Sequence, residues 1–182
     1  MPRPDPDAYF MGIALAVRAR ANCTGRRVGA VIVRDRRILS TGYNGTPSKM
    51  LNCEEGGCHR CAHPEAYGSG EGYDLCICVH AEQNALLAAA RFGVAIEDCT
   101  MYTTLQPCFG CLKELLQANV REVCYLRPWE SRFPEQYAAL FGRFGARRVR
   151  LVTVDDPAAD WALGRSQTGR ERAQGHESLD AP

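Results

Sequence analysis

Four residues in two short segments have the types and spacing of a hydrolytic metal site. His80 and Glu82 lie in C-V-H-A-E, and Cys108 and Cys111 lie in Q-P-C-F-G-C. One histidine and two cysteines supply three protein ligands for zinc, which leaves the fourth tetrahedral position for water, as in catalytic sites. Glu82 is close enough to His80 to exchange protons with that water without ligating the metal. We therefore predict a catalytic zinc held by His80, Cys108 and Cys111, with Glu82 as the acid/base.

Both segments stand at the beginnings of predicted helices. Residues 81–92 are good helix formers followed by Gly93, and Pro107 begins a second predicted helix. Cys108 and Cys111 share one face of its first turn, where the helix dipole favours the thiolate that zinc requires. The alternative is a structural zinc or a set of buried cysteines. Each motif alone is weakly diagnostic, but their combination at two helix starts favours the catalytic interpretation.

The rest of the chain alternates strands with helices. Asp5-Pro6 has the form of a helix cap and first turn, and the apolar residues that follow recur at helical spacing. Predicted strands span residues 28–33, 38–42, 101–105, 122–126 and 148–154, and another helix spans 135–144. This order predicts an α/β sheet covered by helices on both faces. We place one domain at residues 1–154 and a polar, flexible tail at 155–182.

Composition restricts the class of protein further. With 182 residues, of which 46% are apolar, the chain can bury the core of one domain. Its net charge of +1 does not favour nucleic acid as the main partner. The polar, proline-rich start lacks the apolar stretch of a secretory signal, and no run approaches the roughly 18 apolar residues of a membrane span. We expect a soluble, cytoplasmic protein without a membrane partner.

Six further cysteines surround a long irregular segment at residues 43–76. They are Cys23, Cys53, Cys58, Cys61, Cys76 and Cys78. In a chain without a secretory signal, their C-x-x-C and C-x-C spacing favours metal over disulfides, and a long loop gains most from such a clip. The six could serve one zinc with thiols to spare or two zincs that share thiolates, and the alternative is reduced, packed thiols. Cys99 and Cys124 sit at strand positions and are expected in the core.

Four longer segments carry a family resemblance. They span residues 26–47, which end in G-Y-N-G-T-P, residues 52–58 (N-C-E-E-G-G-C), residues 78–87 and residues 101–111. Together with the order H-x-E then P-C-x-x-C, they resemble the deoxycytidylate (dCMP) deaminases of the cytidine/deoxycytidylate deaminase superfamily. The resemblance implies a three-layer α-β-α sandwich around a five-stranded mixed sheet. It also implies zinc-dependent hydrolysis of dCMP to dUMP and ammonia.

The resemblance further implies substrate contacts. Asn44 would hydrogen-bond the sugar, although Asn44-Gly45 is also a common turn pair, and the backbone around Ala81 would read the base edge. A 5′ phosphate needs cationic donors, but each candidate taken alone is more readily explained as a solvated surface arginine. These candidates are Arg26, Arg27 and Arg127. Where the family has a short polar stretch with a tyrosine, this chain has Trp129, which either packs against the nucleotide or covers the sheet edge.

Metal content and assembly follow from the same resemblance. Similar deaminases carry an additional structural zinc, and the best single site here combines Cys23, Cys53 and Cys78 with one of Cys58, Cys61 and Cys76. Members of this branch are commonly oligomers, often hexamers, activated by dCTP and inhibited by dTTP together with Mg2+. We therefore expect a homo-oligomer, with a hexamer favoured, and regulation by a nucleotide with Mg2+ as a hypothesis.

Two other functions compete with deamination of dCMP. The first is deamination of a cytosine or adenine base in nucleic acid, or of another free nucleotide, by the same zinc chemistry. Near-neutral charge and the lack of an extended basic, aromatic surface argue against nucleic acid. The second is a nucleotide-sensing or DNA-uptake accessory protein without catalysis. Glu82 argues against it, because a protein without catalysis does not need the residue that moves protons.

Overall fold

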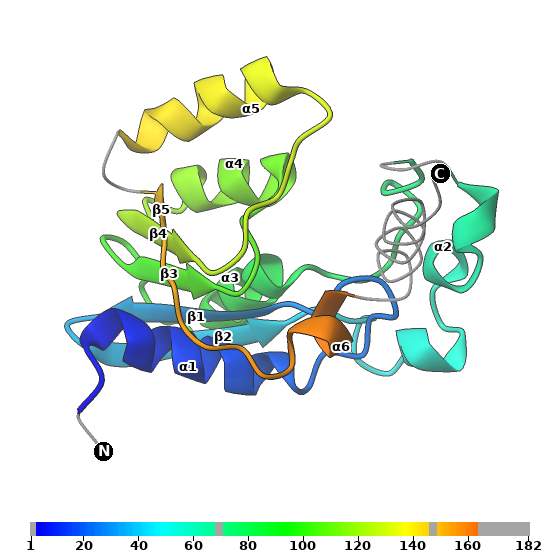
Figure 1. Cartoon of the computed structure of the whole chain (residues 1–182), viewed down its shortest axis with the longest axis horizontal. Helices are drawn as coiled ribbons and strands as arrows, with labels where there is room; N and C mark the ends of the chain where they lie inside the picture. The colour runs from blue at the N-terminus through cyan, green and yellow to red at the C-terminus, as the bar shows by residue number, and fades with distance from the viewer. Residues whose placement is uncertain (1–2, 68–70, 146–148, 164–182) are drawn as a thin grey trace, which may run out of the picture.

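The computed structural model describes residues 3–67, 71–145 and 149–163. In this part of the chain a mixed sheet of five strands lies between two layers of helices (Figure 1). The strands are β1 (Gly29–Arg34), β2 (Arg37–Tyr43), β3 (Thr100–Thr103), β4 (Glu122–Tyr125) and β5 (Val149–Leu151). Their order is β2-β1-β3-β4-β5, with β1 antiparallel to both neighbours and β3, β4 and β5 parallel. The predicted α/β sandwich is confirmed.

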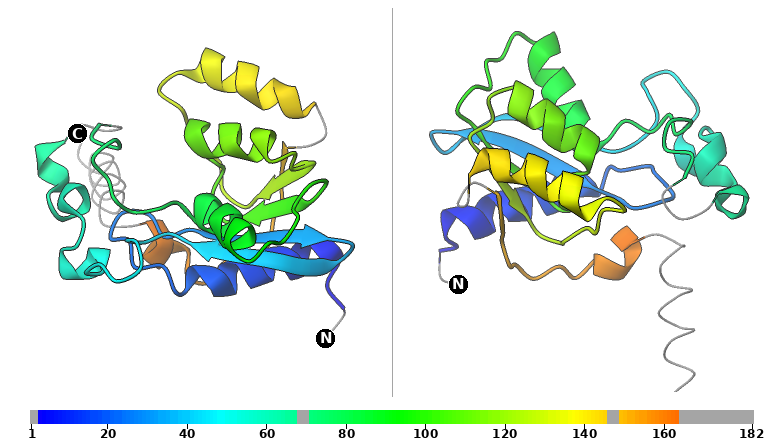
Figure 2. Two further views of the ribbon diagram at one scale, coloured as in Figure 1. Left: turned by 180° about the vertical axis from the view of Figure 1, so that it is seen from behind. Right: turned by 90° about the horizontal axis from the view of Figure 1, so that it is seen from above.

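Helices cover the two faces of the sheet unequally. The main helices are α1 (Pro6–Arg18), α3 (Ala81–Arg91), α4 (Phe109–Gln117) and α5 (Pro134–Phe141). Helix α1 lies on one face, and α3, α4 and α5 lie on the other (Figure 2). Strand residues alternate accordingly: Val31 packs in the cluster that contains α1, and Ile32 packs in the cluster that contains α3 and α4. No helix in the described ranges has the length and hydropathy needed to cross a membrane.

Helix α1 begins as the sequence predicts. The Oδ1 atom of Asp5 accepts a hydrogen bond from the backbone N–H of Ala8 at 2.8 Å, and Pro6 occupies the first turn. Met11 and Ala14 are fully buried against the sheet. Two ion pairs then tie this helix to the end of the domain. Arg150 of β5 donates to Asp7 at 2.6 Å, and Arg18 makes the second pair, with Asp156.

Two glycines allow both helical layers to lie close to the hairpin formed by β1 and β2. A Cβ atom on Gly42 of β2 would lie 2.1 Å from the carbonyl oxygen of Ala81 in α3. A Cβ atom on Gly29 of β1 would lie 2.2 Å from the carbonyl oxygen of Ala14 in α1. Any larger residue at these positions would push the helix away from its strand. Glycine therefore sets the separation between each helix and the sheet.

The segment 155–163 differs from the predicted flexible tail. The guanidinium of Arg18 donates to both carboxylate oxygens of Asp156, at 2.6 and 2.9 Å, and their side chains are only 3% and 5% exposed. Helix α6 (Ala159–Leu163) follows, and the carbonyl of Ala162 accepts a hydrogen bond from the N–H of Arg27 at 2.9 Å. The polar residues of this segment indicated a flexible tail, but one of them, Asp156, forms an ion pair with a residue far away in the sequence. Residues 164–182 of the predicted tail lie outside the described residues.

Between β2 and α3, the residues that the structure describes (44–67 and 71–80) form only short elements. They are the 3-10 turns Cys53–Glu55 and Pro64–Ala66 and helix α2 (His59–Ala62). An antiparallel bridge between Gly45 and Val79 joins the two ends of the segment. Both ends therefore meet beside the start of α3.

Candidate metal centre and active site

His80, Cys108 and Cys111 come together at the starts of α3 and α4. The Nδ1 atom of His80 lies 3.5 Å from the Sγ atom of Cys108 and 3.3 Å from that of Cys111. All three ligand atoms lie within 4.8 Å of one another. Around a tetrahedral zinc with Zn–S near 2.3 Å and Zn–N near 2.0 Å, a sulfur and a nitrogen would be about 3.5 Å apart. The three side chains therefore fit one zinc ion and leave its fourth position open.

Helix caps place these ligands. His80 is the N-cap of α3, and its backbone N–H donates to the Oε1 atom of Gln83 at 3.1 Å. Cys108 is the N-cap of α4, and Cys111 is in its first turn. The helix thus begins at Phe109, two residues later than the sequence predicts, but both thiols still lie at its positive end.

Hydrogen bonds among the three ligand side chains shift their pKa values. Hydrogen bonding to Cys108 raises the pKa of His80 to about 9. Hydrogen bonds from Cys111 and from His80 lower the pKa of Cys108 to about 4, against the effect of burial. The pKa of Cys111 is raised, first by its hydrogen bond with Cys108 and then by burial. A bound dication would replace these shared protons, because zinc binds thiolate and neutral imidazole.

Glu82 is buried beside this group of ligands. Glu82 is only 4% exposed, and this burial raises the pKa of its carboxyl group. The Oγ1 atom of Thr103 lies 3.0 Å from the Oε1 atom of Glu82 and 3.1 Å from the carbonyl oxygen of Leu105. The single hydroxyl proton of Thr103 can thus point to either acceptor. Ionised Glu82 accepts a hydrogen bond from this hydroxyl, and protonated Glu82 can instead donate a hydrogen bond to the Oγ1 atom of Thr103.

The sequence did not indicate Thr103, or three residues whose hydrogen bonds position the ligand-bearing helices α3 and α4. The Nε2 atom of Gln83 in α3 donates to the Oε1 atom of Glu114 in α4 at 3.0 Å, which joins the two helices that carry the ligands. The hydroxyl of Tyr137 in α5 donates to the carbonyl of Pro107 at 2.7 Å. The alternation of β3 could have indicated Thr103, because it lies on the same side of the strand as Met101, toward α3.

Asn44 is buried and its side chain is fixed by the backbone around it. Its Oδ1 atom accepts from the N–H of Val28 and its Nδ2 atom donates to the carbonyl of Arg26, both at 2.7 Å. One amide N–H and one oxygen lone pair remain for another partner. The bridge between Gly45 and Val79 places this loop beside His80. Ala81, the other residue expected near the base, is fully buried at the start of α3.

The three candidate arginines have different surroundings. Arg27 donates to the carbonyl of Trp161 at 3.1 Å, and its guanidinium lies 4.5 Å from the centre of that indole ring. Arg127 forms an ion pair with Asp156 at 3.2 Å. The guanidinium of Arg26 makes no hydrogen bond or ion pair within the described ranges. Among the three candidates, Arg26 is thus the one whose guanidinium has no partner in the part of the chain that the structure describes.

Trp129 contacts the domain through its ring and its backbone. The indole lies 5.7 Å from the ring of Tyr137, edge to face, and packs against the core on the α3 and α4 side. The backbone N–H of Trp129 donates to the Oε1 atom of Gln106 at 3.1 Å. Trp129 therefore covers this side of the core, next to the segment that leads into Cys108.

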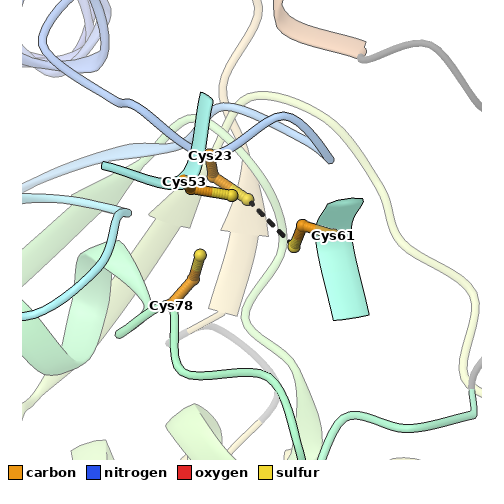
Figure 3. Close-up of side chains that lie close together, drawn as sticks. All are labelled: Cys23, Cys53, Cys61 and Cys78. Carbon is orange, nitrogen blue, oxygen red and sulfur yellow. Dashed lines mark hydrogen bonds between the residues drawn. The ribbon is translucent and has the colours of Figure 1, made fainter. Parts of the chain in front are cut away.

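The six remaining candidate ligands lie together near the open end of the β1–β2 hairpin, opposite its turn. Cys23, Cys53, Cys61 and Cys78 point toward one another (Figure 3). A second group consists of Cys58, Cys61, Cys76 and Cys78. His59 is exposed and hydrogen-bonds Tyr67, and neither it nor His63 joins these groups. Cys99 and Cys124 are fully buried in the core, as predicted.

A mixed sheet that carries His-x-Glu and Pro-Cys-x-x-Cys at two helix starts is the arrangement typical of zinc-dependent deaminases. The family model described as the cytidine and deoxycytidylate deaminase zinc-binding region matches residues 4–127. The chain belongs to this family. The resemblance inferred from the sequence is thus confirmed.

Individual relatives differ in length. Deoxycytidylate deaminase of Saccharomyces cerevisiae is 45% identical over 123 residues, which cover 68% of this chain but 38% of that protein. This chain thus spans well under half of the yeast relative. Deoxycytidylate deaminase of Mycobacterium phage D29 is 40% identical over 128 residues, which cover 69% of this chain and 97% of that protein. The crystal structure of dCMP deaminase from the cyanophage S-TIM5 in complex with dCMP and dUMP has a TM-score of 0.63 at 28% identity, covering 84% of this chain and 100% of that chain.

Proposed function

We propose that this protein catalyses the hydrolytic deamination of dCMP to dUMP and ammonia. The observation that carries the proposal is the convergence of His80, Cys108 and Cys111 within 4.8 Å, with Glu82 buried beside them. The names of its relatives and the nucleotides in the cyanophage structure support dCMP as the substrate.

The residues have distinct roles in this reaction. His80, Cys108 and Cys111 would hold a zinc ion, which would supply a nucleophile by lowering the pKa of a bound water to about 7. Glu82 would accept one proton from the attacking water and deliver it to the ring nitrogen of cytosine. It would then accept the second proton, from the hydroxyl group added to the ring carbon, and deliver it to the amine that leaves as ammonia while the carbonyl of dUMP forms. Thr103 donates to Oε1 of Glu82 and leaves its Oε2 atom for proton transfer. Burial excludes bulk water from this carboxyl group.

Substrate contacts form the second part of the proposal. The remaining N–H of Asn44 would bind the sugar, and the backbone of Ala81 would read the base. Among the arginines, Arg26 has the strongest support as the phosphate ligand, because Arg27 and Arg127 already contact residues near the end of the domain. Trp129 would border the nucleotide while it covers the core.

Further proposals concern metals, assembly and compartment. We propose that the cysteine cluster holds at least one structural zinc, which its close sulfur atoms support. By family resemblance we propose a homo-oligomer, with a hexamer favoured, and regulation by nucleotides with Mg2+. We place the protein in the cytoplasm, where reducing conditions keep clustered thiols available for metal.

Ammonia release from purified protein tests the proposed substrate. The substrates would be dCMP, dCTP, deoxycytidine and a cytosine-containing oligonucleotide, and we expect dCMP to be deaminated fastest. Turnover of the oligonucleotide without turnover of dCMP would refute the proposal. Glu82→Gln should retain zinc and lose almost all turnover, and appreciable turnover by this variant would exclude Glu82 as the proton carrier.

A further inference from the structure

The six clustered cysteines lie outside the proposed deamination chemistry and come from separate parts of the chain. Cys23 follows α1, Cys53 is in the first 3-10 turn, Cys58 and Cys61 are at α2, and Cys76 and Cys78 precede α3. None of them forms a disulfide. Folding of a segment with little regular structure thus brings six thiols to one place.

Their sulfur atoms form two overlapping groups of four. Within each group all sulfur atoms lie within 4.8 Å of one another. One group consists of Cys23, Cys53, Cys61 and Cys78, and the other of Cys58, Cys61, Cys76 and Cys78. Cys61 and Cys78 belong to both. Two tetrahedra that share one edge have six corners, so the two groups account for all six cysteines.

The sulfur separations match those around tetrahedral zinc. The Sγ atoms of Cys23 and Cys61 are 4.0 Å apart, those of Cys58 and Cys76 are 3.7 Å apart, and those of Cys61 and Cys76 are 3.8 Å apart. With Zn–S near 2.3 Å, the edge of a tetrahedron of thiolates is about 3.8 Å long. A disulfide would instead require about 2.05 Å.

We propose that the six cysteines hold two zinc ions in one binuclear cluster, in which the thiolates of Cys61 and Cys78 bridge the metals. Cys23 and Cys53 complete the first tetrahedron, and Cys58 and Cys76 complete the second. A single zinc in the first group would leave the fully buried thiol of Cys58 and its neighbour Cys76 without a metal.

Contacts around the cluster suit a structural role. The N–H of Thr24 lies 3.5 Å from the Sγ atom of Cys53 and can stabilise a terminal thiolate. Among the described residues, the buried cluster in this region consists of the cysteines themselves, and Ile77 is the other apolar residue packed against it. Metal–thiolate bonds therefore take the place of an apolar core and contribute folding free energy.

The bridging position of Cys78 links the cluster to the candidate active site. Cys78 is two residues before His80, and Val79 between them pairs with Gly45. Loss of the cluster should thus loosen both the ligand His80 and the loop of Asn44. The proposal stands on the sulfur geometry and does not depend on which nucleotide the protein deaminates.

Metal counting tests the stoichiometry. We expect zinc-replete, full-length protein to contain three zinc ions per chain by elemental analysis, one at His80, Cys108 and Cys111 and two in the cluster. Cys58→Ser/Cys76→Ser should contain two, because it removes only the second tetrahedron. Cys99→Ser, a buried cysteine outside the cluster, is the matched control and should contain three. Cys108→Ser/Cys111→Ser should lose one zinc whatever the cluster holds, which separates the catalytic site from the cluster.

Cadmium NMR of the wild-type protein tests the bridging thiolates even if the serine variants fail to fold. Cadmium in place of zinc should give two thiolate-type resonances with scalar coupling to each other, because shared sulfur atoms connect the two nuclei. A total of two zinc ions per wild-type chain, a Cys58→Ser/Cys76→Ser variant with undiminished zinc, or two uncoupled cadmium signals would each overturn the proposal.

Discussion

Replacement of Gly42 by alanine should impair catalysis through the position of α3. The added Cβ atom would lie 2.1 Å from the carbonyl oxygen of Ala81 and 2.4 Å from the backbone nitrogen of Ala85. Backbone atoms cannot rotate away as a side chain can. Helix α3 must therefore move from β2, and the N-cap His80 and the buried Glu82 move with it.

The size of this displacement follows from the contact. Real Cβ atoms essentially never approach other atoms closer than 3.0 Å, so the 2.1 Å contact must open by about 0.9 Å. A misplacement of about 1 Å in a catalytic group costs roughly 100-fold in rate. Overpacking of this kind also lowers the free energy of unfolding by about 1–3 kcal/mol. We expect Gly42→Ala to reduce kcat/KM for dCMP by roughly 100-fold.

Gly29→Ala is the matched control, because it creates a similar backbone clash on the other face of the hairpin. Its Cβ atom would lie 2.2 Å from the carbonyl oxygen of Ala14 in α1, a helix that carries none of the proposed site residues. It should lose comparable stability in urea denaturation but retain kcat/KM per folded, zinc-loaded molecule. If Gly42→Ala is as active as Gly29→Ala within about threefold, the reasoning that α3 sets the site geometry is refuted.

Three further substitutions test other contacts. Thr103→Val removes the donor to Glu82 and should lower kcat by roughly 10- to 100-fold with unchanged zinc content; an unchanged kcat would show that the hydroxyl does not orient the carboxyl group. Asp156→Asn leaves Arg18 buried without a counter-charge and should lower the free energy of unfolding by about 3 kcal/mol. The hydrogen bond from Arg18 holds the pKa of Asp156 below its ordinary value of 3.8. The ion pair therefore stabilises the fold fully above pH 3.8, and this stabilisation is lost as the pH falls through the lowered pKa. Denaturation curves of the wild type and the variant should therefore converge only in acid. Arg26→Ala should raise KM for dCMP about tenfold without affecting deoxycytidine, and an equal effect on both substrates would exclude a phosphate contact.

Much of the fold follows from local signals in the sequence. Asp5-Pro6 marks the start of α1, and the continuous apolar run from Ala30 to Val33 matches a strand buried on both faces. The three-residue spacing of Cys108 and Cys111 after Pro107 placed both thiols at one helix start. These features depend on residues near one another in the chain, so a sequence pattern can reveal them.

Other features depend on which distant residues meet. Helix α6 has five residues, too few for a periodic pattern, and is preceded by Asp156, whose partner is 138 positions away. Tyr137 reaches the segment before Cys108 only because α5 packs beside α4. The spacing of the cysteines indicated metal binding but not which cysteines bind the same ion. Their division into two overlapping groups depends on the path of the long loop, which a sequence pattern does not reveal.

The ion pairs of α1 have a consequence for the order in which the chain can fold during synthesis. Asp7 pairs with Arg150, 143 positions later, and Arg18 pairs with Asp156, 138 positions later. On the ribosome, the first helix is made early but its buried arginine has no carboxylate partner until residue 156 has been added. The two ion pairs that tie α1 to the end of the domain can therefore form only late in synthesis, so before that point α1 has to be held mainly by its apolar contacts with the sheet.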